Sequence, residues 1–413
     1  MPPIELTFQV PPEQLAVLRQ ALKRHGAVAQ RLPPKSAAGA GLAVDAKRLA
    51  CEMPDGAARI DVALDEGRLV AGASAQAVRA LTLASDDPHA LFALAKDWTA
   101  GHGLSLDTRS LGERAGVLAR GGDHGPPVKA STPAVEPGLS GPRLLRRVIR
   151  STLDQVLANA SEVAAGSTDE EHVHQLRVGL RRLRTALREL RALDAGIDAA
   201  WQAPLAGTFA QLGQLRDDDT VARAVRPLLE QAGAPKVEWT APAEPVDAGA
   251  TVRDARFQAV LLDLLRFAAP QTHDMTHGDA MPHDAAVAHL RRRLGRLHRR
   301  VARGGKRFES LAPEDQHRVR KRLKRLRYLA EFVAPLWPGK AVQRYLKHLG
   351  PAQDALGRHN DIAVAAGRFR DDAATDPRAL FAAGLLQGHL RVTARDAHEA
   401  LAEVADARRF WKR

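Results

Sequence analysis

The stretch HQLRVGLRRLR at residues 174–184 is decisive for the fold, because it returns as HRVRKRLKRLR at residues 317–327. His, Arg, a basic pair, Leu and Arg stand at the same offsets in both copies, 143 residues apart. Offsets of 0, 3, 7 and 10 follow one face of an α-helix, so each copy predicts a helix with a row of basic groups. The first stripe is His174, Arg177, Arg181 and Arg184, and the second stripe is His317, Arg320, Lys324 and Arg327.

Apolar residues follow a different face of both predicted helices. A face of this kind is normally buried in a helical core. Each copy therefore predicts a packed helix that carries a dense row of positive charge on another side. The apolar positions are Leu176, Leu180, Leu183, Val319, Leu323 and Leu326.

A second motif repeats with nearly the same period. LGQLRD at residues 212–217 returns as LGRHND at residues 356–361, a separation of 144. A basic amphipathic helix precedes each stripe, at residues 143–160 and 289–308. Features that keep one order and one period indicate the internal duplication of a helical bundle. We expect the Gly of the motif to allow close helix approach and its Asp to orient an Arg of a stripe.

Composition places the chain among helical proteins that bind anions. Its 413 residues are 45% apolar and only 4% aromatic, which favours helix packing over a large sheet. The formal net charge is +13, yet residues 1–125 hold 14 Lys/Arg and 14 Asp/Glu. The whole excess of positive charge therefore lies after residue 125, which assigns polyanion binding to that part.

Several classes of protein are disfavoured by the same sequence. No run approaches 18 apolar residues, so we expect no membrane span. The N-terminus lacks the features of a secretion signal, so we expect a cytoplasmic protein. The single Cys51 excludes an internal disulfide and a cysteine-based zinc site. We expect no cofactor and no metal.

Changes in composition divide the chain into five segments. The pattern after the first linker is almost wholly helical, whereas the part before it mixes strand-like and helical runs. The expected segments are a small α+β domain at 1–118, a Gly/Pro-rich linker at 119–142, a first helical repeat at 143–232, a linker at 233–250 and a second helical repeat at 251–413.

The stripes have two interpretations. A solvated helix face is the ordinary explanation of surface charge, but such faces mix signs because like charges at i and i+4 repel. Residues 317–327 hold seven Lys/Arg and no acid, and the arrangement occurs twice. Arg forks match phosphate oxygens and stay charged, so we interpret the stripes as an anion site. His174 and His317 are either structural or donors to phosphate, and we favour donors.

The tandem His-x-x-Arg helices and LG-x-x-x-D motifs resemble CHAD domains, the conserved histidine α-helical domains, over about residues 140–413. The resemblance implies a mostly α fold of two pseudo-symmetric four-helix bundles whose basic helices bind inorganic polyphosphate. The residues that we expect to bind it are His174, Arg177, Arg181, Arg182, Arg184, Arg188, His317, Arg320, Lys321, Lys324, Arg325 and Arg327, with Arg146, Arg150, Arg292 and Arg296 on the preceding helices.

The N-terminal domain resembles a shortened, degenerate CYTH domain, the triphosphate tunnel fold. Pro3 and Thr7 stand where that family has the first Glu and the Lys of a Glu-x-Glu-x-Lys strand. The strand-like run at residues 79–84 lacks the acids of a second strand. Tunnel enzymes need those carboxylates to hold metal ions, so we expect no triphosphatase activity.

Three functions follow from these patterns. The first is a non-catalytic polyphosphate-binding module that targets polyphosphate granules. The second is nucleic-acid binding through phosphates, which is disfavoured because single-strand binders interleave aromatic residues and the stripes have only Tyr328 nearby. The third is residual triphosphate hydrolysis by the N-terminal domain. We expect weak or no binding of nucleic acid.

Overall fold

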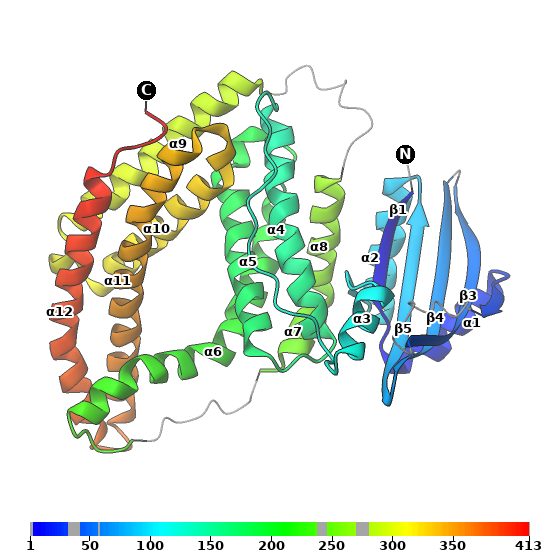
Figure 1. The fold of residues 1–413 in the computed structure, drawn as a ribbon, viewed down its shortest axis with the longest axis horizontal. Coiled ribbons are helices and arrows are strands. Elements are labelled where there is room, and N and C mark those ends of the chain that lie inside the picture. The colour runs from blue at the N-terminus through cyan, green and yellow to red at the C-terminus, as the bar shows by residue number, and fades with distance from the viewer. Residues whose placement is uncertain (1–2, 32–41, 57, 238–245, 270–280, 413) are drawn as a thin grey trace.

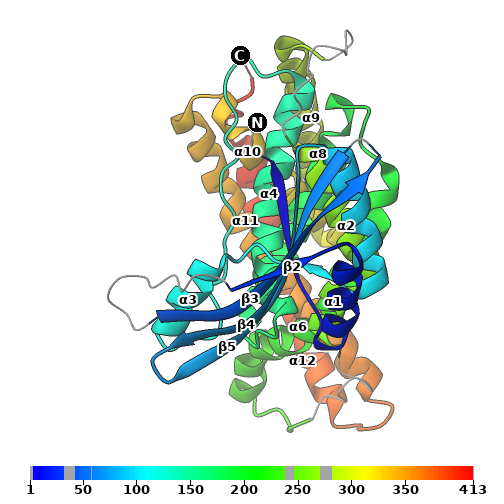
Figure 2. The same ribbon diagram turned by 90° about the vertical axis from the view of Figure 1, so that its right-hand side faces the viewer.

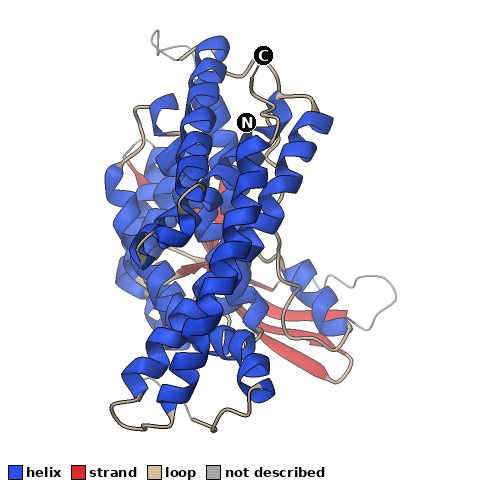
Figure 3. Ribbon diagram, turned by 90° about the vertical axis from the view of Figure 1, so that its left-hand side faces the viewer, coloured by secondary structure: helices blue, strands red, loops and turns tan. Residues whose placement is uncertain are grey.

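The computed structural model describes residues 3–31, 42–56, 58–237, 246–269 and 281–412. A small β-sheet lies at one end of the molecule, and the helices form two groups beside it (Figure 1). Helix α6 (Gln202–Gln231) crosses from the first group of helices to the second. The fold class is therefore mostly α with a small α+β domain at the N-terminus. In Figure 3, helices lie in front of part of the sheet, and the ends of several strands project beyond them at the lower right.

The sheet has antiparallel strands in the order β2-β3-β4-β5-β1-β6. Its apolar face packs against α1 (Leu15–Arg24) and α2 (Pro88–His102), whereas α3 (Leu111–Ala119) covers part of the other face (Figure 2). The strands are β1 (Ile4–Gln9), β2 (Val28–Arg31), β3 (Leu42–Asp55), β4 (Ala58–Ala71), β5 (Ser74–Ser85) and β6 (Ser105–Leu106).

Strand β4 is longer than the strand-like runs of the sequence indicate, and β3 has no such run. Residues 58–64 and 68–71 look like two separate strands, yet they form the single strand β4. Gly67 makes this possible, because a Cβ at this position would lie 2.2 Å from the backbone oxygen of Asp45 on β3. A strand that touches its neighbour so closely tolerates only glycine there.

The first group of helices lies beside the sheet domain and carries the first stripe. Asp169 caps α5 by accepting a hydrogen bond from the backbone of Glu171, and Pro142 lies in the first turn of α4. The leucines of the α5 apolar face are fully buried against α4. The group consists of α4 (Gly141–Ala164), α5 (Glu170–Glu189), α7 (Ala248–Arg253) and α8 (Ala255–Ala268), with α6 leading to the second group.

The second group of helices carries the second stripe and ends the chain. Pro313 begins its stripe helix, and Glu314 and Asp315 lie in the first turn, where carboxylates favour a helix start. Val319, Leu323 and the other apolar positions of this helix are buried. The group consists of α9 (His283–Gly305), α10 (Pro313–Val333), α11 (Gly339–Asp372) and α12 (Ala379–Asp406).

The Gly/Pro-rich segment at residues 119–142 lies along α4 rather than spanning open space between domains (Figure 1). The Asn159 side chain on α4 donates to the backbone oxygen of Val128 at 2.9 Å and accepts from its nitrogen at 3.1 Å. Val135 is buried in the core. The segment is therefore part of the packed structure. The second expected linker, 233–250, includes residues 238–245, which lie outside the described residues.

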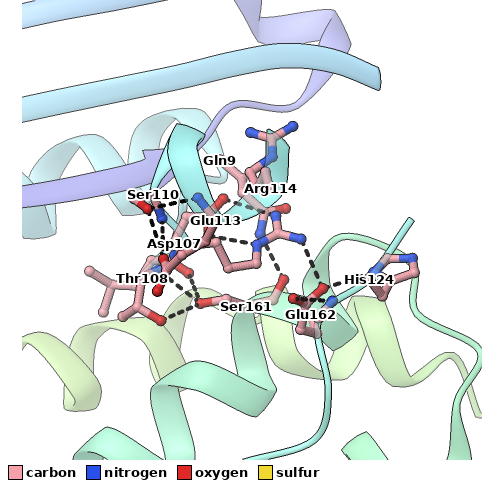
Figure 4. A network of polar contacts seen from close by, with 12 residues as sticks. Gln9, Asp107, Thr108, Ser110, Glu113, Arg114, His124, Ser161 and Glu162 are labelled. Carbon is pink, nitrogen blue, oxygen red and sulfur yellow. Dashed lines mark hydrogen bonds and ion pairs between the residues drawn. The ribbon is translucent and has the colours of Figure 1, made fainter. Parts of the chain in front are cut away.

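A polar network joins the N-terminal domain to the end of α4 (Figure 4). The Gln9 side chain on β1 donates to the backbone oxygen of Ser161 at 2.9 Å. Arg109 forms a 3.0 Å ion pair with Glu162 on α4 and is held by Asp107 at 2.8 Å. Apolar residues of both domains also belong to one continuous core. In the described part of the chain, no helix has the length and apolarity that crossing a bilayer requires.

Candidate functional site

Helix α5 places the first stripe by burying its apolar face against α4. Leu176, Leu180 and Leu183 are fully buried. Gly179 allows the two helices to approach, because a Cβ at this position would lie 2.9 Å from Val156 on α4. With one face fixed in this way, helical geometry directs the arginines of the stripe to the opposite side.

Helix α10 places the second stripe in the same way. Val319, Leu323 and Leu326 are buried at 1% exposure or less. Here Gly304 on α9 provides the close approach, because a Cβ there would lie 2.5 Å from the Val319 side chain. The basic groups of α10 therefore point away from α9, as those of α5 point away from α4.

The two stripes face each other across one cleft. Its volume is about 720 Å³, and α6 and α11 supply the rest of its walls. We call it the basic cleft. Its described lining is Arg177, Arg181, Arg184, Thr185 and Arg188 on α5, Phe209 on α6, His317, Arg318, Arg320, Lys321, Arg322, Lys324, Arg325 and Tyr328 on α10, and Asn360, Asp361 and Val364 on α11.

Positive charge dominates the basic cleft. Asp361 is the one carboxylate among the described residues that line it. Burial, followed by the charges of Arg181 and Arg320, lowers the pKa of Lys324 to about 7, although Asp361 opposes this shift. Burial, followed by Arg188 and Arg181, also lowers the pKa of Arg184. An anion that entered this space would relieve the repulsion between these groups.

His317 is the imidazole of the second stripe. Its Nδ1 lies 3.0 Å from Oδ1 of Asn360 on α11. Because an amide oxygen only accepts hydrogen bonds, this contact places a proton on Nδ1. Burial lowers the pKa of His317, the hydrogen bond to Asn360 raises it, and the charges of Lys321 and Arg320 lower it further.

Phe209 lies beneath three arginines of α5. The Cζ atoms of Arg177, Arg181 and Arg184 lie 5.4, 5.2 and 5.6 Å from the centroid of its ring. These distances fall within the range of cation–π attraction. Phe209 stands three residues before the first LG-x-x-x-D motif, and Asn360 lies inside the second. Neither residue was expected at the site from the sequence.

Nine of the sixteen expected site residues line the basic cleft. They come from both stripes and from the positions beside them, so the duplicated motif does bring its charges to one place. The nine are Arg177, Arg181, Arg184, Arg188, His317, Arg320, Lys321, Lys324 and Arg325.

Arg182 and Arg327 lie outside this lining and share one acid, Glu331 on α10. The Arg182 guanidinium donates to Glu331 at 2.7 Å and lies over the Phe332 ring at 5.0 Å. Arg327 donates to the same carboxylate at 2.8 Å and to Gln353 on α11 at 3.2 Å. Both guanidinium groups therefore join helices to one another.

The other five expected residues also lie outside the described lining of the cleft. Arg146 forms an ion pair with Asp194 at 3.2 Å, and Arg150 with Asp154 at 3.2 Å. Arg292 and Arg296 are exposed on α9. His174 is half-buried on α5.

In the second copy of the motif, the Gly has a different environment from the one expected, whereas the Asp lies among the basic groups of the cleft. Close approach of helices occurs at Gly179 and Gly304, whereas a Cβ at Gly357 would meet no atom within 4 Å. The expectation for Gly357 was therefore wrong, because that face of α11 has open space. Asp361 lies in the cleft, where its charge acts on Lys324. The side chain of Asp217 lies outside the described residues.

Comparison with known proteins identifies the family of the helical part. The family model of the CHAD domain matches residues 147–370, which is more than half of the chain. The chain belongs to the CHAD family. The CHAD domain from the plant Ricinus communis is similar in structure, with a TM-score of 0.55 and 25% sequence identity, over 69% of this chain and 98% of that one. A search of curated protein sequences found no match.

Proposed function

We propose that this CHAD protein binds inorganic polyphosphate in the basic cleft and does not act on it chemically. One observation carries the proposal. Two stripes that stand 143 residues apart in the sequence line one cleft, in which Asp361 is the single described carboxylate. A cleft with this excess of guanidinium and ammonium groups favours a ligand of high, regularly spaced negative charge.

Polyphosphate suits the cleft because it is thin and lacks bases. Each phosphate offers oxygens to an Arg fork, and each charged hydrogen bond contributes about 1.5–3 kcal/mol. His317 supports the same reading, since its Nδ1 proton is engaged by Asn360 and its other nitrogen can take a proton when an anion is near.

Nucleic acid fits the cleft less well. The aromatic rings in its described lining are Phe209, which three guanidinium groups cover, and Tyr328, which is 7% exposed. Neither offers an open face on which a base could stack. Contacts with the phosphates of a duplex remain the alternative, and we expect them to be weak.

The N-terminal domain supports a non-catalytic protein. Asp65 lies on the partly polar face of the sheet, where Arg48 forms two 2.7 Å hydrogen bonds to its carboxylate. A carboxylate neutralised in this way is a poor ligand for a metal ion. The alternative is hydrolysis by this domain. Metal-dependent release of phosphate from tripolyphosphate would support it.

The experiment is a titration of the full chain with long-chain polyphosphate and with duplex DNA of matched charge, at several salt concentrations. We expect tight binding of polyphosphate that weakens steeply with salt, because each neutralised phosphate releases counterions. Equal affinity for both polymers would favour an unselective basic surface and nucleic-acid binding. We further propose a cytoplasmic protein located at polyphosphate granules, which imaging of a tagged chain in cells that make polyphosphate would test.

A further inference from the structure

Arg177, Arg181 and Arg184 of the first stripe lie close together although their charges repel one another. They follow one another at spacings of four and three residues on α5, where like charges repel. Burial lowers the pKa of Arg184, and the charges of Arg188 and Arg181 lower it further. The Nε atom of Arg184 is also buried without a hydrogen-bond partner. Side chains in this position gain by turning toward water unless another contact keeps them in place.

Phe209 is the contact that these arginines have in common. Its ring centroid lies 5.2–5.6 Å from the Cζ atoms of Arg177, Arg181 and Arg184. The ring belongs to α6, packs against the apolar core and lines the basic cleft. An aromatic face attracts a cation through its quadrupole but carries no net charge. It therefore holds guanidinium groups without neutralising them.

In the second half of the protein, the arginine equivalent to Arg184 has different partners. A shift of 143 residues takes Arg184 to Arg327, and a shift of 144 takes Phe209 to Gln353. Arg327 donates to Gln353 at 3.2 Å and to Glu331 at 2.8 Å, and it lies outside the described lining of the cleft. Arg327 is thus held by an amide and by a carboxylate that neutralises its charge. Arg184, which lines the cleft, contacts an aromatic ring instead.

We propose that Phe209 is the positioning residue of the anion site: its ring holds the guanidinium groups of Arg177, Arg181 and Arg184 toward the basic cleft while leaving their charge available to the ligand. This inference rests on the proposed binding of polyphosphate for its functional consequence. The placement of the arginines is a property of the ligand-free protein. Organising them before binding reduces the ordering that the ligand must impose.

The test compares Phe209→Leu, which keeps an apolar side chain but removes the ring, with Phe209→Trp, which restores an aromatic face. Phe267→Leu is the matched control, because Phe267 is half-buried and lies 5.4 Å beneath Arg146, outside the described lining of the cleft. Polyphosphate affinity and melting temperature are measured for all four proteins. We expect Phe209→Leu to weaken binding roughly tenfold with little change in melting temperature, and Phe209→Trp and Phe267→Leu to bind like the parent.

A second measurement needs no ligand. The Nε–H resonances of Arg177, Arg181 and Arg184, assigned by single Arg→Lys variants, should be shifted upfield by the ring in the parent and lose this shift in Phe209→Leu. Unchanged resonances in Phe209→Leu, or a loss of affinity that follows melting temperature and is not restored by Trp, would overturn the positioning role. If the parent protein does not bind polyphosphate, the proposed function fails, and the resonances still decide whether Phe209 holds the arginines.

Discussion

At the scale of single residues, Lys324 couples anion binding to pH. Its pKa of about 7 arises from burial and from Arg181 and Arg320, with Arg177 adding to them and Asp361 on α11 opposing them. A bound polyanion favours the charged ammonium, so the pKa rises in the complex. Below pH 7 Lys324 is charged in both states, whereas above it binding must take up a proton. Affinity should therefore fall as pH rises above 7, by at most roughly tenfold per pH unit.

The measurement is polyphosphate affinity between pH 7 and 9 in the parent and in Lys324→Arg. The pKa of His317 is lowered in the free protein and a bound anion raises it, but this contribution is present in both proteins and does not distinguish them. The guanidinium of Lys324→Arg stays charged throughout this range. The variant should therefore lose the part of the pH dependence of affinity that comes from Lys324 and keep any part that comes from the end groups of polyphosphate. Identical profiles in the two proteins would contradict the coupling.

Two adjacent arginines should have opposite roles. Arg181 lines the basic cleft, whereas Arg182 is 4% exposed and paired with Glu331 at 2.7 Å. Arg182→Ala leaves that acid short of a partner, so the free energy of unfolding should fall by about 2–3 kcal/mol. Arg181→Ala should change it by less than about 0.5 kcal/mol but weaken polyphosphate binding about tenfold. Denaturant unfolding and titration of both variants check this division, and a reversed pattern would refute it.

At the scale of helices, α5 and α10 act as two walls of one site. Reversing two charges on either wall, as in Arg177→Glu/Arg181→Glu or Arg320→Glu/Lys324→Glu, should weaken polyphosphate binding at least about a hundredfold. Because both walls face the same ligand, reversing all four should abolish binding. Circular dichroism would verify that the helices remain.

The matched control reverses charge on a different helix. Arg299 and Arg300 are exposed on α9 and lie outside the described lining of the cleft. Arg299→Glu/Arg300→Glu changes the net charge by the same amount as either wall variant. A much smaller loss of affinity is expected. An equal loss would mean that overall charge, and not the cleft, attracts the ligand.

At the scale of the whole molecule, the N-terminal domain is fastened to the helices through Glu162. The side chain of this residue is 9% exposed and contacts Arg109 at 3.0 Å, His124 at 2.8 Å and the backbone nitrogen of Gly125 at 3.0 Å. Glu162→Ala removes all three contacts, so the unfolding free energy should fall by about 2–4 kcal/mol. The segment 119–142 should become easier to cleave, while polyphosphate affinity stays unchanged because the cleft is elsewhere.

Limited proteolysis, thermal melting and titration of Glu162→Ala test this fastening. Glu66→Ala is a suitable control, since its ion pair with Arg19 lies on the surface of the sheet domain at 40% exposure and contributes little. Cleavage at equal rates in the two variants would mean that Glu162 does not fasten the domain, and that the apolar contacts and the Gln9–Ser161 hydrogen bond hold it.

The sequence by itself determined which face of each stripe helix is buried and which face is charged. The spacing of Leu176, Leu180 and Leu183 fixes which face of α5 is buried, and the offsets of the stripe fix which face is charged. Periodicity is a local property, since side chains three or four positions apart share a face in any α-helix. The repeat of both motifs then indicated the helical duplication and the family. In the sheet, by contrast, the run of β3 carries little alternation and was missed.

Only the tertiary structure decided which charges meet. Arg182 has the same local pattern as its neighbours, yet it turns to Glu331, because the packing of α5 against α10 brings that acid near. Arg327 reaches the same acid within its own helix, four residues away, and the packing of α11 adds Gln353 as its second partner. Phe209 reaches the first stripe because α6 packs against α5. That both stripes line one cleft depends on contacts between helices more than a hundred residues apart, which no local spacing encodes.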